Sequence, residues 1–323
     1  MKKRIIILGS IVLLLVIAWT AGWYFVTGQI RQQVEALAFA DGETSPQLTC
    51  ATLGMGGYPF NIDIDCTDAV IVSGDVMVEI PEVRASAVVY RPTHLIASAR
   101  GAAEISDAFT GQRSALSWDG LEASLRVDNW RIARLSIVGT NVSWNDLLFG
   151  DALIARAGTV EMHLLDIPER HDAQEGLADL ALYARTTALD FPGAAVQAAD
   201  IELESEITRL PDDLRDIDTA TLLPTWQRAG GRLDAIALRS KDAGSDLEAN
   251  GNLMLDEAGL LNGQIDITSH GVAERIGPMI EEPWRTLVLG VPGNDGRHVN
   301  QVNFRAGTVS SGLVPLGAIP PLF

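Results

Sequence analysis

Lysine is almost absent from this 323-residue sequence. Lys2 and Lys3 precede Arg4 at the N-terminus, and Lys241 is the one remaining lysine. The residues after Arg4 contain 21 basic side chains against 42 acidic ones, a net charge of -21 at neutral pH. A surface this acidic repels phosphate backbones and anionic headgroups. The composition therefore predicts that nucleic acid is not a partner.

The motifs of the common enzyme classes are also missing. The sequence has no GxSxG, no GxxxxGK[ST], no GxGxxG that opens a helix and no HExxH. Its five histidines are scattered, without the HxH or HxxxH spacing of metal ligands. Aspartate and glutamate are so abundant that a pair of carboxylates identifies nothing. We therefore predict a protein that is not an enzyme, with no catalytic residue, no metal site and no cofactor. The alternative is a periplasmic hydrolase whose site has no recognisable motif.

Cysteine occurs only twice, as Cys50 and Cys66. A single pair in an exported domain predicts a disulfide, and the absence of CxxC argues against a metal pair. The closed loop of about 15 residues stabilises the fold by roughly 3 kcal/mol. Between Asn61 and Cys66 apolar and polar residues alternate, which places Cys66 on the buried side of a strand. From there it can meet Cys50 across a hairpin.

Long apolar runs are absent except for one, Ile5 to Val26. It contains no charged residue, and a helix of this length crosses a hydrocarbon core of roughly 30 Å. Basic residues precede the run, and Trp19, Trp23 and Tyr24 lie near its far end. This order predicts a single-pass inner-membrane anchor with its N-terminus in the cytoplasm and the main domain in the periplasm. The alternative is a cleaved signal peptide, with Val16-Ile17-Ala18 as its cleavage site.

The hydropathy pattern divides the chain into three parts. Residues 1–26 form the cytoplasmic tail and anchor. In residues 27–44, Ile30, Val34 and Leu37 recur at helical spacing, which predicts an amphipathic helical stalk. Residues 45–323 form the exported domain, in which apolar and polar residues alternate with period two and turn signals recur at about ten-residue spacing.

This alternation predicts a mostly β fold. We expect the transmembrane helix to be followed by a large antiparallel, meandering and twisted sheet, either a groove or a partly closed barrel, with a few short capping helices. Short helices are expected in residues 211–228 and 272–289, the second stretch interrupted by Pro278 and Pro283. The closing segment, residues 312–323, is apolar and proline-rich, and we expect it to pack without regular hydrogen bonding.

The apolar face of such a sheet has two possible fates. It forms either an open groove for acyl chains or a partner, or the closed core of a structural or interaction module, and the alternation fits both. The residues expected to line a groove are Leu121, Leu125, Val160, Leu164, Leu253 and Ile265. Besides the membrane itself, the partners that fit are lipid or another envelope protein.

Two local motifs resemble a known family. One is a cysteine on each side of a Gly-Tyr-Pro-Phe turn, and the other is a closing Gly-x-x-Pro-Leu-Gly-x-x-Pro-Pro-Leu. With the N-terminal anchor, they resemble domain of unknown function family 2125 of Gram-negative bacteria, which has no assigned activity. The outline is also similar to the AsmA-like envelope proteins, which are anchored, rich in β structure and implicated in handling lipid, so that resemblance implies a lipid ligand. The residues concerned are Cys50, Gly57, Tyr58, Pro59, Phe60, Cys66, Gly312, Pro315, Leu316, Gly317, Pro320, Pro321 and Leu322.

Overall fold

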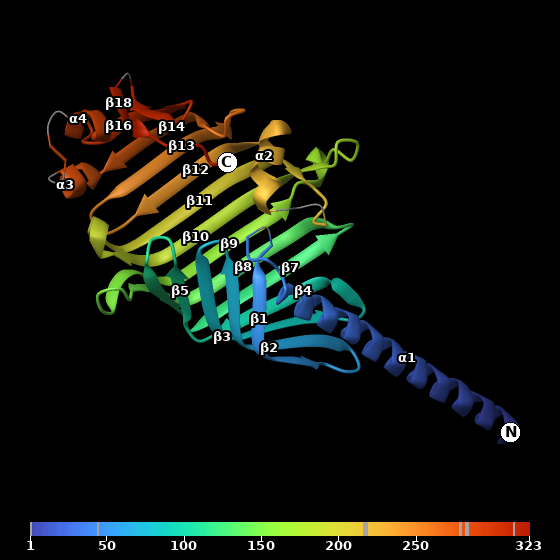
Figure 1. Cartoon of the computed structure of the whole chain (residues 1–323). Helices are drawn as coiled ribbons and strands as arrows, with labels where there is room; N and C mark the ends of the chain where they lie inside the picture. Colours follow the sequence, from blue (N-terminus) through green and yellow to red (C-terminus); the bar gives the residue numbers. More distant parts are fainter. Residues whose placement is uncertain (1, 44, 216–218, 278–279, 282–283, 313) are drawn as a thin grey trace. The chain divides into compact units, whose positions relative to one another are not determined.

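The computed structural model describes residues 2–43, 45–215, 219–277, 280–281, 284–312 and 314–323. It confirms the predicted fold class: one long apolar N-terminal helix is followed by extensive antiparallel β structure and a few short helices (Figure 1). The chain forms two compact units, Met1–Arg113 and Ser114–Phe323, called unit 1 and unit 2 below.

Unit 1 combines the long helix with an antiparallel meander. The strands β1, β2, β3 and β4 pair in chain order, and β5 pairs with the first residues of β3. The elements are α1 (Lys2–Leu37), β1 (Gln47–Gly56), β2 (Asn61–Ser73), β3 (Val76–Val88), β4 (Arg91–Arg100) and β5 (Ala103–Asp107). The predicted turn at Ser73-Gly74-Asp75 joins β2 to β3, and Gly74 adopts the left-handed conformation that such a turn requires (φ 57°).

Helix α1 continues without a break from the apolar run into the amphipathic stretch. Trp23 and Thr27 are buried, Ile30 and Val34 are half-buried, and this face of α1 packs on β1. Arg31 Nη2 donates to the carbonyl of Leu53 at 3.2 Å. These contacts join the second half of the helix to the first hairpin of unit 1.

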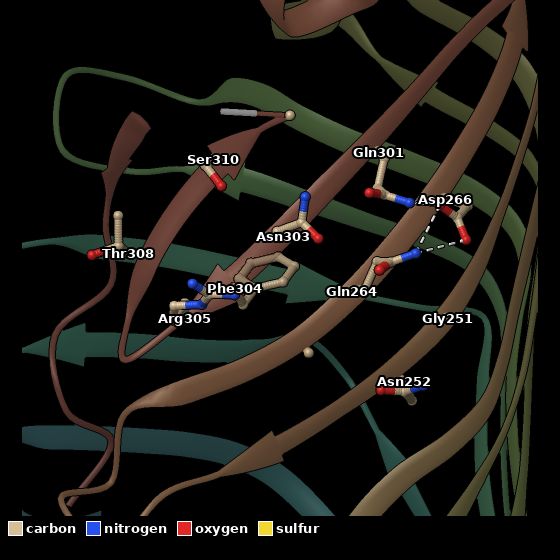
Figure 2. Close-up of a pocket in the computed structure, with 12 residues that line it drawn as sticks. Gly251, Asn252, Gln264, Asp266, Gln301, Asn303, Phe304, Arg305, Thr308 and Ser310 are labelled. Carbon is tan, nitrogen blue, oxygen red and sulfur yellow. Dashed lines mark hydrogen bonds between the residues drawn. The ribbon is translucent and has the colours of Figure 1, made fainter. Parts of the chain in front are cut away.

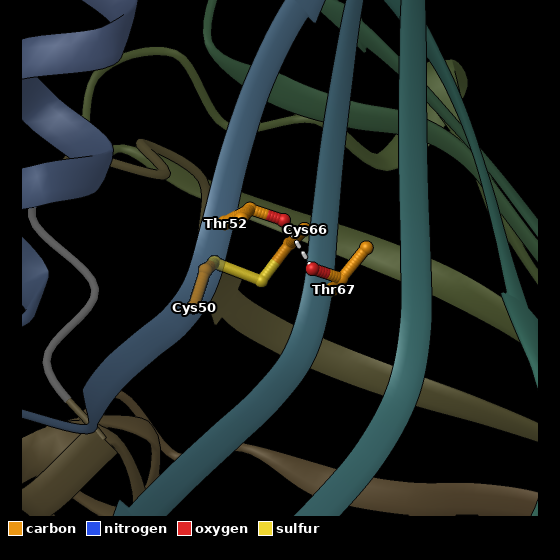
Figure 3. The surroundings of a disulfide bond; sticks show 4 residues. All are labelled: Cys50, Thr52, Cys66 and Thr67. Atoms are coloured by element: carbon orange, nitrogen blue, oxygen red, sulfur yellow. Dashed lines mark hydrogen bonds between the residues drawn. A yellow bond between two sulfur atoms is a disulfide. The ribbon is translucent and has the colours of Figure 1, made fainter.

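The predicted disulfide is present between Cys50 and Cys66, with a Cα–Cα distance of 5.4 Å (Figure 3). Cys66 lies opposite Leu53 and Cys50 opposite Ala69 in the β1–β2 ladder, so the bridge runs diagonally across the hairpin. Cys66 is buried, as the alternation predicts. The hydroxyls of Thr52 and Thr67 hydrogen-bond beside it.

Unit 2 is a longer antiparallel meander. From β7 to β14 each strand pairs with the next in the chain, β14 then pairs with β16, and β16, β17 and β18 follow in order. Two further strands, β6 and β15, pair with β8 and β16. The strands are β6 (Arg113–Ser117), β7 (Gly120–Asp128), β8 (Arg131–Asp146), β9 (Ala152–Asp166), β10 (Leu177–Phe191), β11 (Val196–Pro211), β12 (Arg232–Lys241), β13 (Asp246–Leu255), β14 (Leu261–His270), β15 (Val291–Pro292), β16 (His298–Arg305), β17 (Thr308–Ser311) and β18 (Val314–Ala318).

Among the described residues, three short α-helices interrupt this meander where the sequence predicts them. They are α2 (Thr219–Arg228), α3 (Val272–Ile276) and α4 (Trp284–Leu289), and two 3₁₀ turns, η1 (Pro168–Arg170) and η2 (Pro192–Ala194), flank β10. Pro278 and Pro283, the expected interruptions, lie outside the described residues. The expectation for the closing segment is wrong in part, because β18 forms an antiparallel pair with β17. The prolines of this segment do not prevent that, since Pro315 lies at a register shift.

Candidate functional site

The structure places the six predicted groove residues on one face of the sheet in unit 2. Directly opposed residues of an antiparallel ladder point to the same side, so the register assigns the faces. Leu125 lies opposite Leu135 of β8, Leu135 opposite Leu164, and Leu164 opposite Leu182 of β10. The remaining residues, Leu121, Val160, Leu253 and Ile265, follow from the same registers. We call this side the apolar face.

One row of apolar side chains crosses the sheet from β7 to β14. With strands about 4.8 Å apart, eight strands extend over about 34 Å. Each residue of the row lies opposite the next: Ala123, Ile137, Met162, Ala184, Leu203, Leu238, Ala249 and Ile267. The apolar face is therefore continuous over these strands.

The other face of the same strands is charged. Glu161, Arg185, Glu202, Arg239 and Glu248 lie opposite one another from β9 to β13, so the sign of the charge alternates from strand to strand. The Arg185 guanidinium and the Glu202 carboxylate lie 3.6 Å apart. The two faces of the sheet therefore differ in chemistry, one apolar and the other charged.

The apolar face is only partly covered. Most of its leucines, isoleucines and valines are half-buried, and Val160 is 38 % exposed. In the described part of the chain no large side chain is fully buried, and Leu180 comes nearest at 2 % exposed. A closed core of this length encloses many large apolar side chains at crystal-like packing density. The apolar face therefore leaves many of its apolar side chains partly accessible to solvent.

An apolar pocket of about 260 Å³ lies where helix α2 covers this face. Its wall comes from β11 to β14, from α2 and from the C-terminal segment, and every lining residue is apolar. They are Ile207, Leu210, Leu222, Leu223, Trp226, Leu233, Leu253, Met254, Leu255, Leu261 and Leu322. Of the six predicted groove residues, Leu253 alone lines this pocket.

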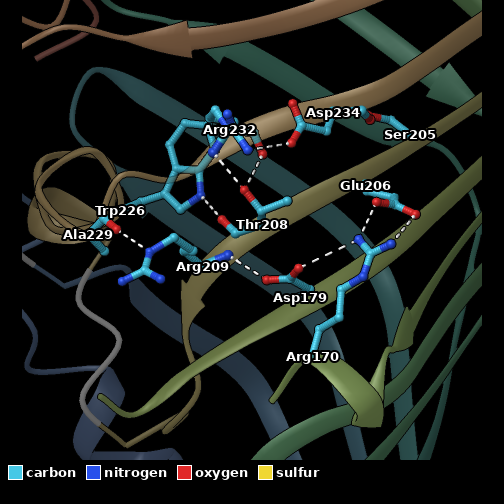
Figure 4. A network of polar contacts seen from close by, with 10 residues as sticks. All are labelled: Arg170, Asp179, Ser205, Glu206, Thr208, Arg209, Trp226, Ala229, Arg232 and Asp234. Atoms are coloured by element: carbon cyan, nitrogen blue, oxygen red, sulfur yellow. Dashed lines mark hydrogen bonds and ion pairs between the residues drawn. The ribbon is translucent and has the colours of Figure 1, made fainter. Parts of the chain in front are cut away.

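Trp226 fixes α2 over the pocket (Figure 4). Its indole Nε1 donates to the carbonyl of Thr208 at 2.7 Å, and the side chain is 7 % exposed. Gly231 leaves room for the ring, because a Cβ there would lie 2.1 Å from the indole nitrogen. Arg209 Nε also donates to the carbonyl of Ala229, just after the helix. Helix α2, which covers the pocket, is therefore attached to the sheet through specific contacts.

Charged side chains surround this attachment. Asp179 accepts from the backbone N–H of Arg209 at 2.8 Å and lies 3.7 Å from the Arg170 guanidinium. Arg170 also pairs with Glu206 (Figure 4). Hydrogen bonding to Glu206 raises the pKa of Arg170 above its ordinary value. These residues place an ionic network beside β10 and β11.

The polar side of β13, β14, β16 and β17 has a hollow of about 930 Å³ (Figure 2). Its lining is rich in amides and hydroxyls, and Asp266 accepts from Gln264 Nε2 at 3.1 Å and from Gln301 Nε2 at 2.8 Å. The residues that line it are Gly251, Asn252, Gly263, Gln264, Asp266, Gln301, Asn303, Phe304, Arg305, Thr308, Ser310 and Gly312. The sequence alone does not predict this hollow. The signal was the polar alternation of Gln301, Asn303 and Arg305, but it does not reveal which strand lies beside them.

The titratable residues form ion pairs and turn contacts. His171 Nε2 lies 2.8 Å from Asp212, and His163 Nε2 lies 3.3 Å from Glu161. In the described residues neither imidazole has a serine or threonine hydroxyl as partner. No group of three or more His, Cys, Asp or Glu suited to a metal ion occurs among them either.

The carboxyls with lowered pKa values lie in loops or at the ends of strands. Hydrogen bonding by the Arg215 side chain lowers the pKa of Asp213 to about 2. The backbone N–H of Leu260 lowers the pKa of Asp256, which holds the turn before β14. Both shifts favour the ionised carboxylate, which suits a structural contact rather than a general acid.

Comparison with known proteins identifies a family. A family model described as an uncharacterized protein conserved in bacteria (DUF2125) matches residues 23–320. No curated protein and no solved structure matches the chain.

Proposed function

The chain belongs to this family of uncharacterized bacterial proteins, DUF2125, and from its own surfaces we propose that it is a membrane-anchored lipid-binding protein. The ligand is the acyl part of a lipid, held on the apolar face of unit 2. The protein binds this lipid without cleaving it. Helix α1 is long and apolar enough to span a membrane, and it keeps the protein at the source of the ligand.

The observation that carries this proposal is the exposure of the apolar face. A continuous patch of apolar side chains open to water marks a binding surface. This face extends about 34 Å across eight strands. The acyl chains of one membrane leaflet extend about 15 Å, half the thickness of the hydrocarbon core. An acyl chain therefore fits along the face, and each buried methylene contributes about 0.8 kcal/mol.

The pocket beneath α2 supports the same ligand class. Its lining offers no charged side chain to a headgroup, while Leu222, Leu223 and Trp226 supply apolar surface from above. A cavity lined in this way excludes water and accepts hydrocarbon. The ion pair of Arg170 in η1 with Glu206 on the charged face of β11 lies outside this pocket.

The proposal also places the protein in the cell. Lys2, Lys3 and Arg4 precede the apolar run, which favours a cytoplasmic N-terminus and units 1 and 2 in the periplasm. A periplasmic location suits the disulfide, which forms in an oxidising compartment.

A charge on the apolar face tests the proposal. Leu125→Glu puts a carboxylate on this face, and burying it against hydrocarbon costs several kcal/mol. The matched control is Arg126→Glu, which adds the same side chain on the charged face of the same strand. The full chains are purified in detergent, their lipid is extracted and quantified by mass spectrometry, and their fold is followed by circular dichroism.

We expect Leu125→Glu to stay folded and to lose the lipid that the wild type and Arg126→Glu retain beyond the annulus around α1. Unfolding of Leu125→Glu with an intact control would identify a closed core and overturn the groove. An unchanged amount of bound lipid in a folded Leu125→Glu would mean that the apolar face does not hold the lipid, and would favour an interaction module. Chemical conversion of the bound lipid by the wild type would favour the hydrolase.

A further inference from the structure

Three exposed aromatic residues gather at one end of the sheet in unit 1. The β1–β2 turn contains Tyr58, Pro59 and Phe60, and the β3–β4 turn contains Tyr90. The two turns are adjacent, because the backbone N–H of Val89 donates to the carbonyl of Phe60 at 2.9 Å. Tyr58 is 47 %, Phe60 62 % and Tyr90 74 % exposed. We call Tyr58, Pro59, Phe60 and Tyr90 the aromatic tip.

The aromatic tip is attached to helix α1 through the tryptophans of the apolar run. Trp19 Nε1 donates to the carbonyl of Pro59 at 2.9 Å, and Trp23 Nε1 donates to the carbonyl of Asn61 at 2.9 Å. The hydroxyls of Thr20 and Tyr58 lie 2.7 Å apart. The Tyr58 ring also packs edge-on against Trp23, with centroids 5.5 Å apart. These four contacts together fix the position of the aromatic tip along the axis of α1, which we call its height.

This height places the aromatic tip at the membrane. A helix that enters the hydrocarbon at Ile5 needs about 20 residues to cross roughly 30 Å, and so leaves it near Tyr24. Trp19, the contact of Pro59, lies five residues earlier, or about 8 Å along the helix. The β1–β2 turn therefore cannot stand clear of a bilayer that α1 spans.

We propose that the aromatic tip inserts into the interfacial layer of the leaflet from which α1 emerges. Its partner is the glycerol and upper acyl region of a phospholipid bilayer, where tyrosine and phenylalanine rings are well accommodated. The turn from Gly57 to Phe60 contains no charged residue that would oppose entry into the interface. Arg91 is exposed at the same end and reaches the phosphate layer.

This contact gives unit 1 two membrane attachments instead of one. Helix α1 alone leaves a domain free to tilt. The hydrogen bonds of Trp19 and Trp23, together with inserted aromatic rings, hold the strands of unit 1 in a defined orientation to the bilayer. The inference rests on the membrane anchor of the proposed function and is independent of the lipid ligand.

Fluorescent labels on the full chain in phospholipid vesicles test the insertion. Phe60→Cys and Tyr90→Cys each provide one reactive thiol, since Cys50 and Cys66 are bonded to each other. Phe109→Cys is the matched control: it replaces an exposed phenylalanine (85 %) beyond β5, whose Asp107 pairs with Val76. That position lies at the opposite end of β3, about 40 Å away along the strand. Each thiol carries a nitrobenzoxadiazole dye, and lipids with a spin label high on the acyl chain act as quenchers.

We expect at least about twofold quenching at positions 60 and 90 and little at 109, because only the interfacial positions reach the quencher. Val12→Cys, in the middle of the apolar run, tests the anchor itself. Quenching at 12 without quenching at 60 and 90 would overturn the insertion and leave the anchor intact. No quenching at 12 would overturn the anchor and the insertion with it. Equal quenching at 60, 90 and 109 would show general adsorption and contradict a specific tip.

Discussion

The contacts that define unit 1 most sharply involve a few residues around its first hairpin. Cys50 and Cys66 cross-link β1 to β2 near the middle of the hairpin, and Trp19 and Trp23 hold its turn against α1. The alternation from Asn61 onward predicts the burial of Cys66, and the count of two cysteines predicts the pairing. The tryptophan contacts are not predictable in this way, because they join residues 38 or more positions apart.

Loss of the disulfide should destabilise unit 1 markedly. Replacing Cys50 and Cys66 together by serine releases a loop of about 15 residues in the unfolded chain and should lower the free energy of unfolding by 2–5 kcal/mol, about 3 on the chain-entropy model. Urea unfolding of both proteins under non-reducing conditions measures this difference. Addition of a reductant provides the control, since it should bring the wild type to the level of the double variant. Maleimide labelling of the denatured, unreduced wild type would contradict the bridge.

The sheet of unit 2 has some features that the local sequence pattern determines and others that depend on distant parts of the chain. Period-two alternation predicts the apolar and charged faces, because the face of a residue depends only on its phase in a strand. The pocket needs more: Leu233, Leu253 and Leu322 meet only through the order of the strands and the return of the C-terminus. The polar hollow around Asp266 and the β17–β18 pair depend on such distant pairings too.

Helix α2 should be sensitive to one methyl group beneath its tryptophan. Gly231→Ala introduces a Cβ that would lie 2.1 Å from Trp226 Nε1, so the ring must move and its hydrogen bond to Thr208 is lost. Overpacking of this kind costs typically 1–3 kcal/mol. We expect faster amide hydrogen exchange in residues 219–228, together with a lower urea midpoint.

The control for this substitution is Gly244→Ala, at an exposed turn where the nearest atom to the new Cβ is Asp242 Oδ1, 4.0 Å away. It makes the same chemical change with little steric effect, and should leave the exchange of α2 as in the wild type. Equal amide hydrogen exchange of α2 in the wild type and Gly231→Ala would mean that Trp226 does not hold α2 over the pocket.

For the whole molecule, the uneven distribution of charge has two consequences. The three basic residues before the apolar run are followed by a chain of net charge -21. Such a chain stays soluble and is repelled by anionic headgroups, so electrostatic attraction does not hold it at a membrane. In the proposed arrangement, attachment comes instead from apolar contact through α1 and the aromatic tip. The same distribution of charge favours one orientation of α1 over the other.

The anchor should be retained, with its N-terminus in the cytoplasm. The apolar residues continue through Trp23 and Tyr24, beyond the Val16-Ile17-Ala18 site, and Trp19 and Trp23 contact the hairpin of unit 1. N-terminal sequencing of membrane-extracted protein should therefore start at or next to Met1, and a start near Trp19 would refute retention.

An epitope at the N-terminus should be protected from protease added to spheroplasts, while unit 2 is digested. Reversing the charge of Lys2, Lys3 and Arg4 to glutamate should reduce the digested fraction, since basic residues determine which end stays inside. A digested fraction that the reversal leaves unchanged would show that other residues orient the helix.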